Sequence, residues 1–181
     1  MTTPPTFVAG NVLTAAQMNQ IGAWRTATAT ASGTATTLTV NSCFTADYRH
    51  YRIYLSGSSA VAGNLTFQLT SGGTAAATNY YYNRTVLSYT VANATAQGSA
   101  TTNILVGQLN TGALGSTSNM FIDVLDPQVA APTGIYSVNQ YNTANAGITY
   151  GSHYSAASYD GFKLTGAGNL TLTVAVFGFN P

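Results

Sequence analysis

The chain has 181 residues, which is long enough for one domain with a hydrophobic core and too short for two large ones. Only 5% of the residues are charged and the formal net charge is +1, whereas about a quarter of the residues of ordinary soluble proteins are charged. This balance gives no electrostatic basis for binding nucleic acid or an anionic membrane. It is typical of a subunit whose surface is committed to partners.

The cysteine content and the first residues restrict the chemistry and the route of synthesis. A single cysteine, Cys43, excludes an internal disulfide and a multi-cysteine metal site, and beside Phe44 it is predicted to be a small buried side chain. The first residues show neither the positive charge nor the apolar run of a secretion signal. No apolar run approaches the length of a membrane-spanning helix. We therefore expect synthesis in a cytoplasm without export.

The first segment, residues 1–24, is predicted to be an arm with a short helix. Thr14 is placed as the N-cap, and Gln17 three residues later completes a capping box. Leu13 and Met18 are spaced as the hydrophobic staple of the same helix, and a glycine ends it after about two turns. Because so short a helix is marginal alone, we expect the arm to dock on another protein. The side chains expected to make this contact are Phe7, Val8, Val12, Leu13, Met18, Ile21 and Trp24.

The rest of the chain is predicted to be all-β. Residues 25–37 are rich in Thr and Ala and are assigned as a linker, with a weak edge strand as the other reading. Residues 38–181 form the body, where apolar and polar residues alternate with period two between turn residues. The clearest segment is 170–177, and similar patterns occur at 51–55, 65–69, 104–106, 120–125 and 135–140. Eight or nine such segments predict an antiparallel β-sandwich or jelly roll.

The arm also carries a resemblance to a known class of proteins. Residues 7–19 read Phe-Val-Ala-Gly-Asn-Val-Leu-Thr-Ala-Ala-Gln-Met-Asn, which resembles the "fvaG-x-vLTAaqmN" opening of many small virion proteins of tailed bacteriophages. Segments 48–55, 79–83, 159–164 and 174–181 look like landmarks of tail-fibre and head-fibre β-sandwich domains. The resemblance implies a jelly-roll body that is frequently assembled as a homotrimer.

The chain offers little catalytic or metal-binding chemistry, and we expect no enzyme activity, metal or cofactor. A serine–histidine–aspartate triad from His153 and Asp160 has no nucleophile-elbow motif to support it. Asp123 and Asp126 lie at a strand end, where a turn and a pairing with arginine or solvent are expected rather than glycoside hydrolysis. Asp47 and His50 are three residues apart on a predicted strand. Side chains at that spacing point to opposite faces of the strand, so this pair is not expected to chelate a metal ion.

The twelve tyrosines are the strongest binding signal in the body. A tyrosine combines a rigid apolar ring with a polar tip, which suits a core, a subunit interface and a sugar-stacking surface alike. The Gly- and Ser-rich stretch 143–158 is predicted to be an exposed recognition loop. Its candidate receptor contacts are Tyr150, His153 and Tyr154.

The leading hypothesis from the sequence is a non-enzymatic virion protein of a tailed phage. Its arm would bind other virion proteins, and its trimeric body would attach to a glycan or protein of the host surface as part of a tail fibre or minor tail protein. Weak contacts per subunit would then add through multivalency. The alternative is a capsid decoration protein or head fibre. A polysaccharide-degrading enzyme has too few carboxylates here, and a non-viral lectin leaves the arm unexplained.

Overall fold

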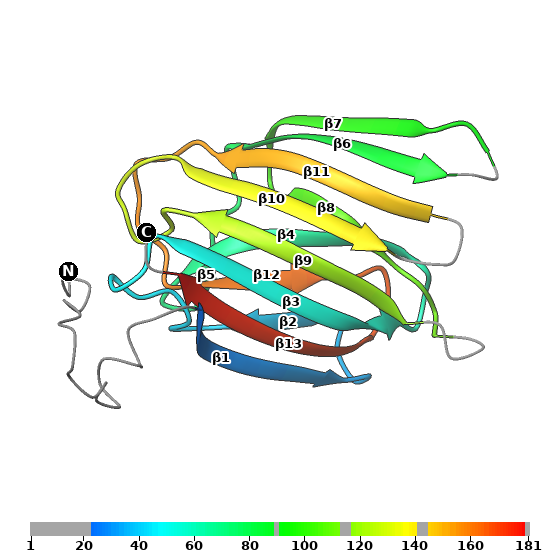
Figure 1. The fold of residues 1–181 in the computed structure, drawn as a ribbon, viewed down its shortest axis with the longest axis horizontal. Coiled ribbons are helices and arrows are strands. Elements are labelled where there is room, and N and C mark those ends of the chain that lie inside the picture. Colours follow the sequence, from blue (N-terminus) through cyan, green and yellow to red (C-terminus); the bar gives the residue numbers. More distant parts are fainter. Residues whose placement is uncertain (1–22, 89–90, 113–116, 141–144, 180–181) are drawn as a thin grey trace, which may run out of the picture.

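The computed structural model describes residues 23–88, 91–112, 117–140 and 145–179. These residues form two antiparallel β-sheets and no helix (Figure 1). The all-β prediction is therefore confirmed for this part of the chain. The predicted helix and every expected docking side chain except Trp24 lie outside the described residues.

Each sheet has a simple order. The larger sheet contains, from edge to edge, β1 (Ala23–Ser32), β13 (Leu170–Phe179), β3 (His50–Ser59), β9 (Ser118–Leu125), β10 (Thr133–Gln140), β11 (Asn145–His153), β6 (Tyr80–Ser88) and β7 (Ala94–Thr101). The smaller sheet contains β2 (Thr37–Val40), β12 (Gly161–Thr165) and β4 (Gly63–Ser71), whose other edge pairs with β8 (Ile104–Leu109) and with the short β5 (Thr74–Ala75).

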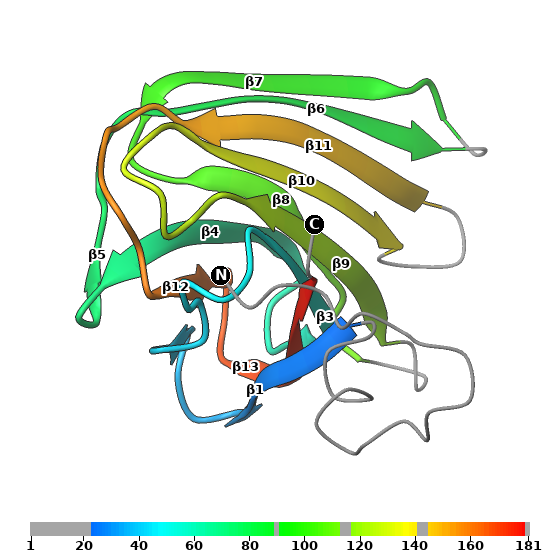
Figure 2. The ribbon, with the colours of Figure 1, turned by 60° about the vertical axis from the view of Figure 1, so that its left-hand side comes forward.

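The two sheets are wound together by four pairs of consecutive strands. In each pair, one strand lies in the larger sheet and the other lies in the smaller sheet. The pairs are β1 and β2, β3 and β4, β8 and β9, and β12 and β13. The order β1-β13-β3-β9 in the larger sheet repeats as β2-β12-β4-β8 in the smaller one. Strands β10, β11, β6 and β7 extend the larger sheet further, which Figure 2 shows from the side.

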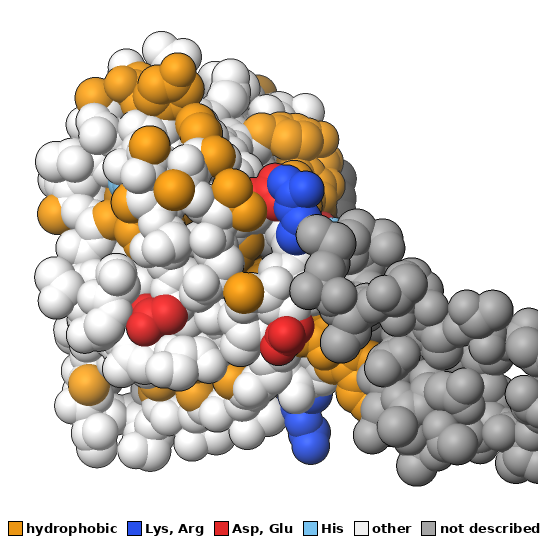
Figure 3. Space-filling model, turned by 90° about the vertical axis from the view of Figure 1, so that its left-hand side faces the viewer, with side chains coloured by type: hydrophobic (Ala, Val, Ile, Leu, Met, Phe, Trp, Pro, Cys, Tyr) orange, Lys and Arg blue, Asp and Glu red, His pale blue; other side chains and the backbone are white. Residues whose placement is uncertain are grey.

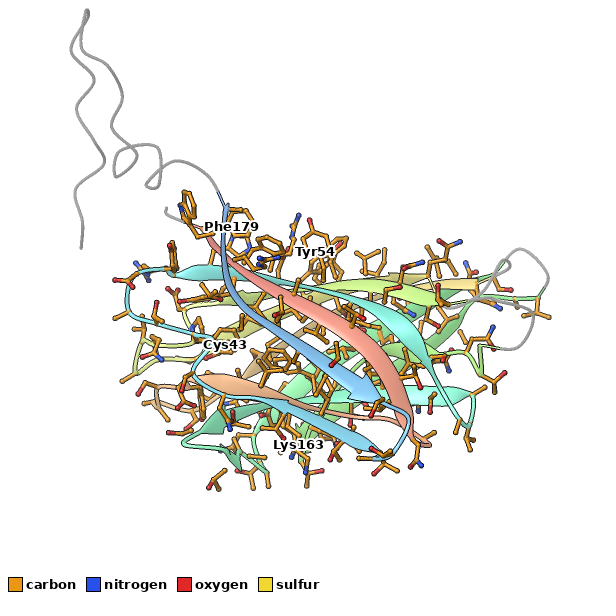
Figure 4. All side chains as sticks on the ribbon, turned by 90° about the horizontal axis from the view of Figure 1, so that it is seen from below. Cys43, Tyr54, Lys163 and Phe179 are labelled. Carbon is orange, nitrogen blue, oxygen red and sulfur yellow. The ribbon has the colours of Figure 1, made fainter. Side chains whose placement is uncertain are left out.

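The core lies between the sheets and follows the period-two pattern. Leu170 and Val174, on the predicted apolar face of β13, are fully buried. Phe162 stacks on Phe67 with ring centroids 5.4 Å apart, and their strands are neighbours in the smaller sheet. Cys43 is buried, as predicted, and lies between the sheets (Figure 4); burial raises the pKa of its thiol to about 12.

Polar side chains join the extended part of the larger sheet to β8. Ser137 donates a 2.6 Å hydrogen bond to the carbonyl of Val106, and Thr149 donates one of 3.0 Å to the carbonyl of Leu105. Both hydroxyl-bearing residues are buried. A buried carbonyl without a partner would cost folding free energy, so these hydroxyls stabilise the contact between the two layers.

The Thr/Ala-rich segment is a correction to the linker assignment. Strand β1 pairs with β13 from Ala23 opposite Phe179 to Ser32 opposite Thr171, with one register shift near its start. Beyond that shift its alanines pack against the core and its threonines are exposed, so the small residues still alternate with period two. Residues 25–32 therefore belong to the sandwich as an edge strand, which was the other reading of this segment.

Candidate functional site: an aromatic face on the larger sheet

The outer faces of the two sheets differ in chemistry. The smaller sheet presents side chains such as Thr39, Thr66, Gln68 and Lys163, and Figure 4 shows Lys163 pointing away from the sandwich. The larger sheet presents aromatic rings on the opposite side, where Figure 4 labels Tyr54. Charged groups are sparse on the side of the molecule shown in Figure 3. The aromatic face is therefore the feature that most needs a functional explanation.

Five rings form a continuous row, which we call the aromatic row: Phe177, Tyr54, Phe121, Tyr136 and Tyr150. Successive ring centroids along it are 5.8, 6.5, 6.1 and 4.8 Å apart. The rings come from five neighbouring strands, β13, β3, β9, β10 and β11. At the usual strand spacing the row spans about 19 Å.

Strand register explains why these rings meet. Tyr54 lies directly opposite Phe121, and Tyr136 lies directly opposite Tyr150. Directly paired residues point to the same face of a sheet. Each ring is the outward member of an alternating strand whose inward members fill the core, as with Tyr54 between the buried Ile53 and Leu55.

A charged cluster lies beside the row. The Arg52 guanidinium donates two hydrogen bonds of 2.7 Å to the two carboxylate oxygens of Asp123. Its Cζ atom lies 4.7 Å from the centre of the Phe121 ring, and His50 Nε2 is 3.3 Å from the same carboxylate. Asp123 thus pairs with an arginine, one of the two outcomes expected for it.

Within this cluster, the positive charge of Arg52 neutralises the negative charge of Asp123. Burial alone would raise the pKa of Asp123, but the hydrogen bonds from Arg52, together with the nearby His50 imidazole, hold this pKa below its usual range. The hydrogen bond to Asp123 raises the pKa of Arg52, so the guanidinium stays charged. The two opposite charges are therefore held together by the paired geometry.

A shallow groove of about 540 Å³ runs along one side of the row. Its apolar lining includes Tyr54, Phe121 and Val138. A second hollow of about 580 Å³ shares Val138 and Gln140 with the first and continues to Leu87 on β6. The two hollows together make an extended surface feature across the larger sheet. The polar side chains of the first hollow are Ser56, Asn119, Gln140 and Thr173.

The structure separates the predicted receptor contacts. Tyr150 is 62% exposed in the aromatic row, and Tyr154 is 67% exposed with its ring 6.5 Å from that of Tyr81. His153 is only 2% exposed and lies between the rings of Tyr80 and Tyr159. The loop prediction is wrong for residues 145–153, because these residues form β11, an internal strand of the larger sheet.

Most of the aromatic row was not predicted from the sequence. Tyr54, Phe121, Tyr136 and Phe177 are the members of predicted strands that alternate with the apolar core positions. That phase was visible in the sequence. Their alignment into one row depends on strand pairing, which the sequence pattern does not give.

His153 occupies a buried site of its own. The Tyr159 hydroxyl is 3.1 Å from His153 Nδ1. Burial lowers the pKa of His153, opposed by a hydrogen bond with the backbone of Thr78. Asp160, the other residue of the triad considered from the sequence, instead accepts hydrogen bonds from the backbone N–H of Gly72.

This lowered pKa predicts an acid-dependent loss of stability. The folded state binds a proton at His153 more weakly than the unfolded state does, so the stability that neutral His153 gives is present above its ordinary pKa of 6.5 and falls below that pH. We expect the melting temperature to drop between pH 7 and 5 and His153→Gln to flatten this dependence. Scanning calorimetry measures both, and Ser152→Ala should keep the wild-type slope. An unchanged slope in His153→Gln would contradict the assignment.

Trp24 is the docking candidate that the structure describes. It is half-buried in β1, opposite Gly178 of β13. Its indole nitrogen is buried and has no hydrogen-bond partner among the described residues. Trp24 is thus part of β1, the edge strand of the larger sheet.

Over 23–88, 91–112, 117–140 and 145–179, no three or more His, Cys, Asp or Glu residues gather where they could hold a metal ion. No helix in the same ranges is long and apolar enough to cross a membrane. Comparisons of the chain with protein-family models, with curated proteins and with solved structures found no match.

Proposed function

We propose that this chain is a non-enzymatic structural protein of a tailed-phage virion, bound to the particle through its N-terminal arm and displaying the β-sandwich for attachment to the host. It is a tail-fibre or minor tail protein in this proposal and assembles as a homotrimer. The observation that carries it is the partly exposed aromatic row on a chain with very few charges. Contiguous exposed aromatic surface marks an interaction site, because a free soluble protein gains nothing from keeping it in water.

The edge strands support an assembled state. Neither β1 nor β7 contains a lysine, a proline or an acidic residue. These are the residues with which free proteins commonly protect sheet edges against pairing with other chains. Strand β7 pairs only with β6 among the described strands. Such edges suit a protein whose neighbours in an assembly cover them.

We also propose that the sandwich is of the jelly-roll type. The support is the repeated strand order of the two sheets, in which four consecutive pairs wind around one core. The resemblance of residues 7–19 to phage virion proteins agrees with this reading and supplies the docking function of the arm.

The second candidate is a capsid decoration protein or head fibre. The contrast between the aromatic outer face of the larger sheet and the Thr- and Gln-bearing face of the smaller one favours it. A subunit that lies flat on a particle needs one face for binding and one for solvent. Copy number separates the two candidates, since a capsid protein is present in far more copies than a tail fibre.

Immunogold electron microscopy of purified virions tests the proposal, with antibody raised against residues 23–181. Label at the tail or its tip would support host attachment. Label spread over the head would support the decoration function. Virions that carry no label, from a lysate in which the protein is detected by immunoblot, would overturn both candidates.

Removal of residues 1–22 is expected to abolish incorporation into virions while leaving the β-sandwich folded. The cut stops before Ala23 because Ala23 and Trp24 pair with β13. Circular dichroism measures folding, and immunoblotting of purified particles measures incorporation. Removal of residues 1–3 alone keeps the 7–19 motif and serves as the matched control. Normal incorporation of the longer truncation would contradict docking by the arm, as would normal incorporation of the Leu13→Asp/Met18→Asp variant.

A further inference from the structure

We infer that the groove beside the aromatic row binds a neutral oligosaccharide. This inference rests on the proposed function in host attachment and names the chemical class of the ligand. It concerns the hollow of about 540 Å³ lined by Tyr54 and Phe121 together with Ser56, Asn119 and Gln140.

The aromatic part of the groove provides a stacking surface. Tyr54 is 47% exposed, and the Phe121 ring beside it is half-buried with the two centroids 6.5 Å apart. The hydrophobic C–H face of a sugar ring packs on such rings, because they combine a large rigid area with an electron-rich face. Both rings stand on strands of one sheet and each has only two side-chain torsions, so little conformational entropy is lost on binding.

The polar part of the groove provides hydrogen bonds that are not used within the protein. Among the described residues, no hydrogen bond engages the exposed side-chain amides of Asn119 and Gln140. The comparable amide of Gln68, on the smaller sheet, donates to the carbonyls of Ala76 and Thr102. An amide both donates and accepts, as a sugar hydroxyl does, so Asn119 and Gln140 are suited to recognising hydroxyl groups.

The charges near the groove favour a neutral ligand. No residue that lines it is ionised at neutral pH. The nearest opposite charges, Arg52 and Asp123, satisfy each other through two hydrogen bonds. An acidic sugar would therefore find no free cation here, and a basic ligand would find no free carboxylate.

The dimensions favour a chain of sugars over a single one. A volume of about 540 Å³ lies within the usual range for ligand sites, about 300–1,000 Å³. The second hollow continues from Val138 and Gln140 toward β6. A linear oligosaccharide can follow this path across the strands.

The first test is binding of the purified full-length protein to an array of bacterial polysaccharides, half of them neutral and half containing uronic acids. We expect binding to a subset of the neutral polysaccharides. An oligosaccharide cut from the best neutral polysaccharide is then titrated by isothermal calorimetry. Binding only to the uronic-acid polysaccharides, or to none, would overturn the inference.

Two groove variants locate the site. Tyr54→Ala removes the exposed ring, and Gln140→Leu removes the amide while keeping a similar size. Each is expected to weaken binding of the titrated oligosaccharide at least about tenfold, as expected for loss of a central contact. Tyr81→Ala removes another exposed tyrosine on the same face outside the groove, and should bind like wild type. Equal affinities for Tyr54→Ala and Tyr81→Ala would overturn the location.

A second copy of the chain is the competing occupant, and sedimentation velocity distinguishes it. If Tyr54→Ala dissociates the oligomer and leaves oligosaccharide binding unchanged, the groove is a subunit interface and the inference is wrong. The outcomes are also separate from those of the proposed function. Labelled virions with no saccharide binding would overturn only this inference, whereas saccharide binding with unlabelled virions would overturn only the virion assignment.

Discussion

Phe162→Ala is expected to lower the free energy of unfolding by about 3–5 kcal/mol, the usual range for removal of a buried phenylalanine ring. Phe162 is fully buried between the sheets, where its ring centroid lies 5.4 Å from that of Phe67 and 5.9 Å from that of Phe44. Its removal leaves a cavity that the two fixed sheets fill only in part. Since domains are stable by about 5–15 kcal/mol, this is a large fraction of the total.

Urea denaturation followed by circular dichroism measures this loss, and the neighbouring Lys163 provides the matched control. Lys163 lies on the same strand but points outward, so Lys163→Ala should change the stability by at most about 0.5 kcal/mol. Similar losses in the two variants would contradict the inward and outward phase of β12.

Arg52→Met is expected to destabilise the fold by about 1–3 kcal/mol at neutral pH, because Asp123 keeps its charge in a buried position after losing two hydrogen bonds. The lowered pKa of Asp123 means that the pair stabilises the protein above the ordinary pKa of 3.8, and that this contribution is lost as the pH falls through the pKa of the folded state. The stability difference between wild type and variant should therefore shrink below about pH 4.

Urea denaturation at pH 7 and at pH 3 measures this prediction. The double variant Arg52→Met/Asp123→Leu is the control, because it removes both charges and leaves none unpaired. It should recover most of the stability lost in Arg52→Met. A loss of equal size at both pH values would show that Arg52 acts through its packing on Phe121 and not through Asp123.

The sequence predicts the faces of strands well because each face obeys a local rule. The core positions of β3, β4 and β13 follow from period-two alternation of large apolar residues, and all of these segments form strands with the expected face inward. Strand β1 also alternates with period two, but its small residues make the alternation hard to recognise in the sequence. Ala27 and Ala29 contribute little hydrophobicity, so the pattern is weak although the strand is ten residues long.

The candidate site required information that no local pattern holds. Tyr150 was predicted to be an exposed candidate receptor contact. Its neighbour in the row, Tyr136, was not assigned to a site. Their contact follows from the register of β10 against β11. The same register places His153 on the inner face, three positions from Tyr150, since successive side chains of a strand point to opposite faces. Composition alone grouped these residues, whereas the pleat of the strand separates them.

The pairing of β1 with β13 has a consequence for how the nascent chain folds. Thr26 and Val176 are hydrogen-bonded partners that lie 150 residues apart in the chain. Strand β1 therefore cannot pair with β13 until the chain through Phe179 has left the ribosome. Contacts between residues so far apart in the sequence also make folding slow, on a scale of milliseconds to seconds. Until β13 is available, β1 remains unpaired. Its alanines and threonines are less hydrophobic than valine or isoleucine, which limits the tendency of the unpaired strand to aggregate.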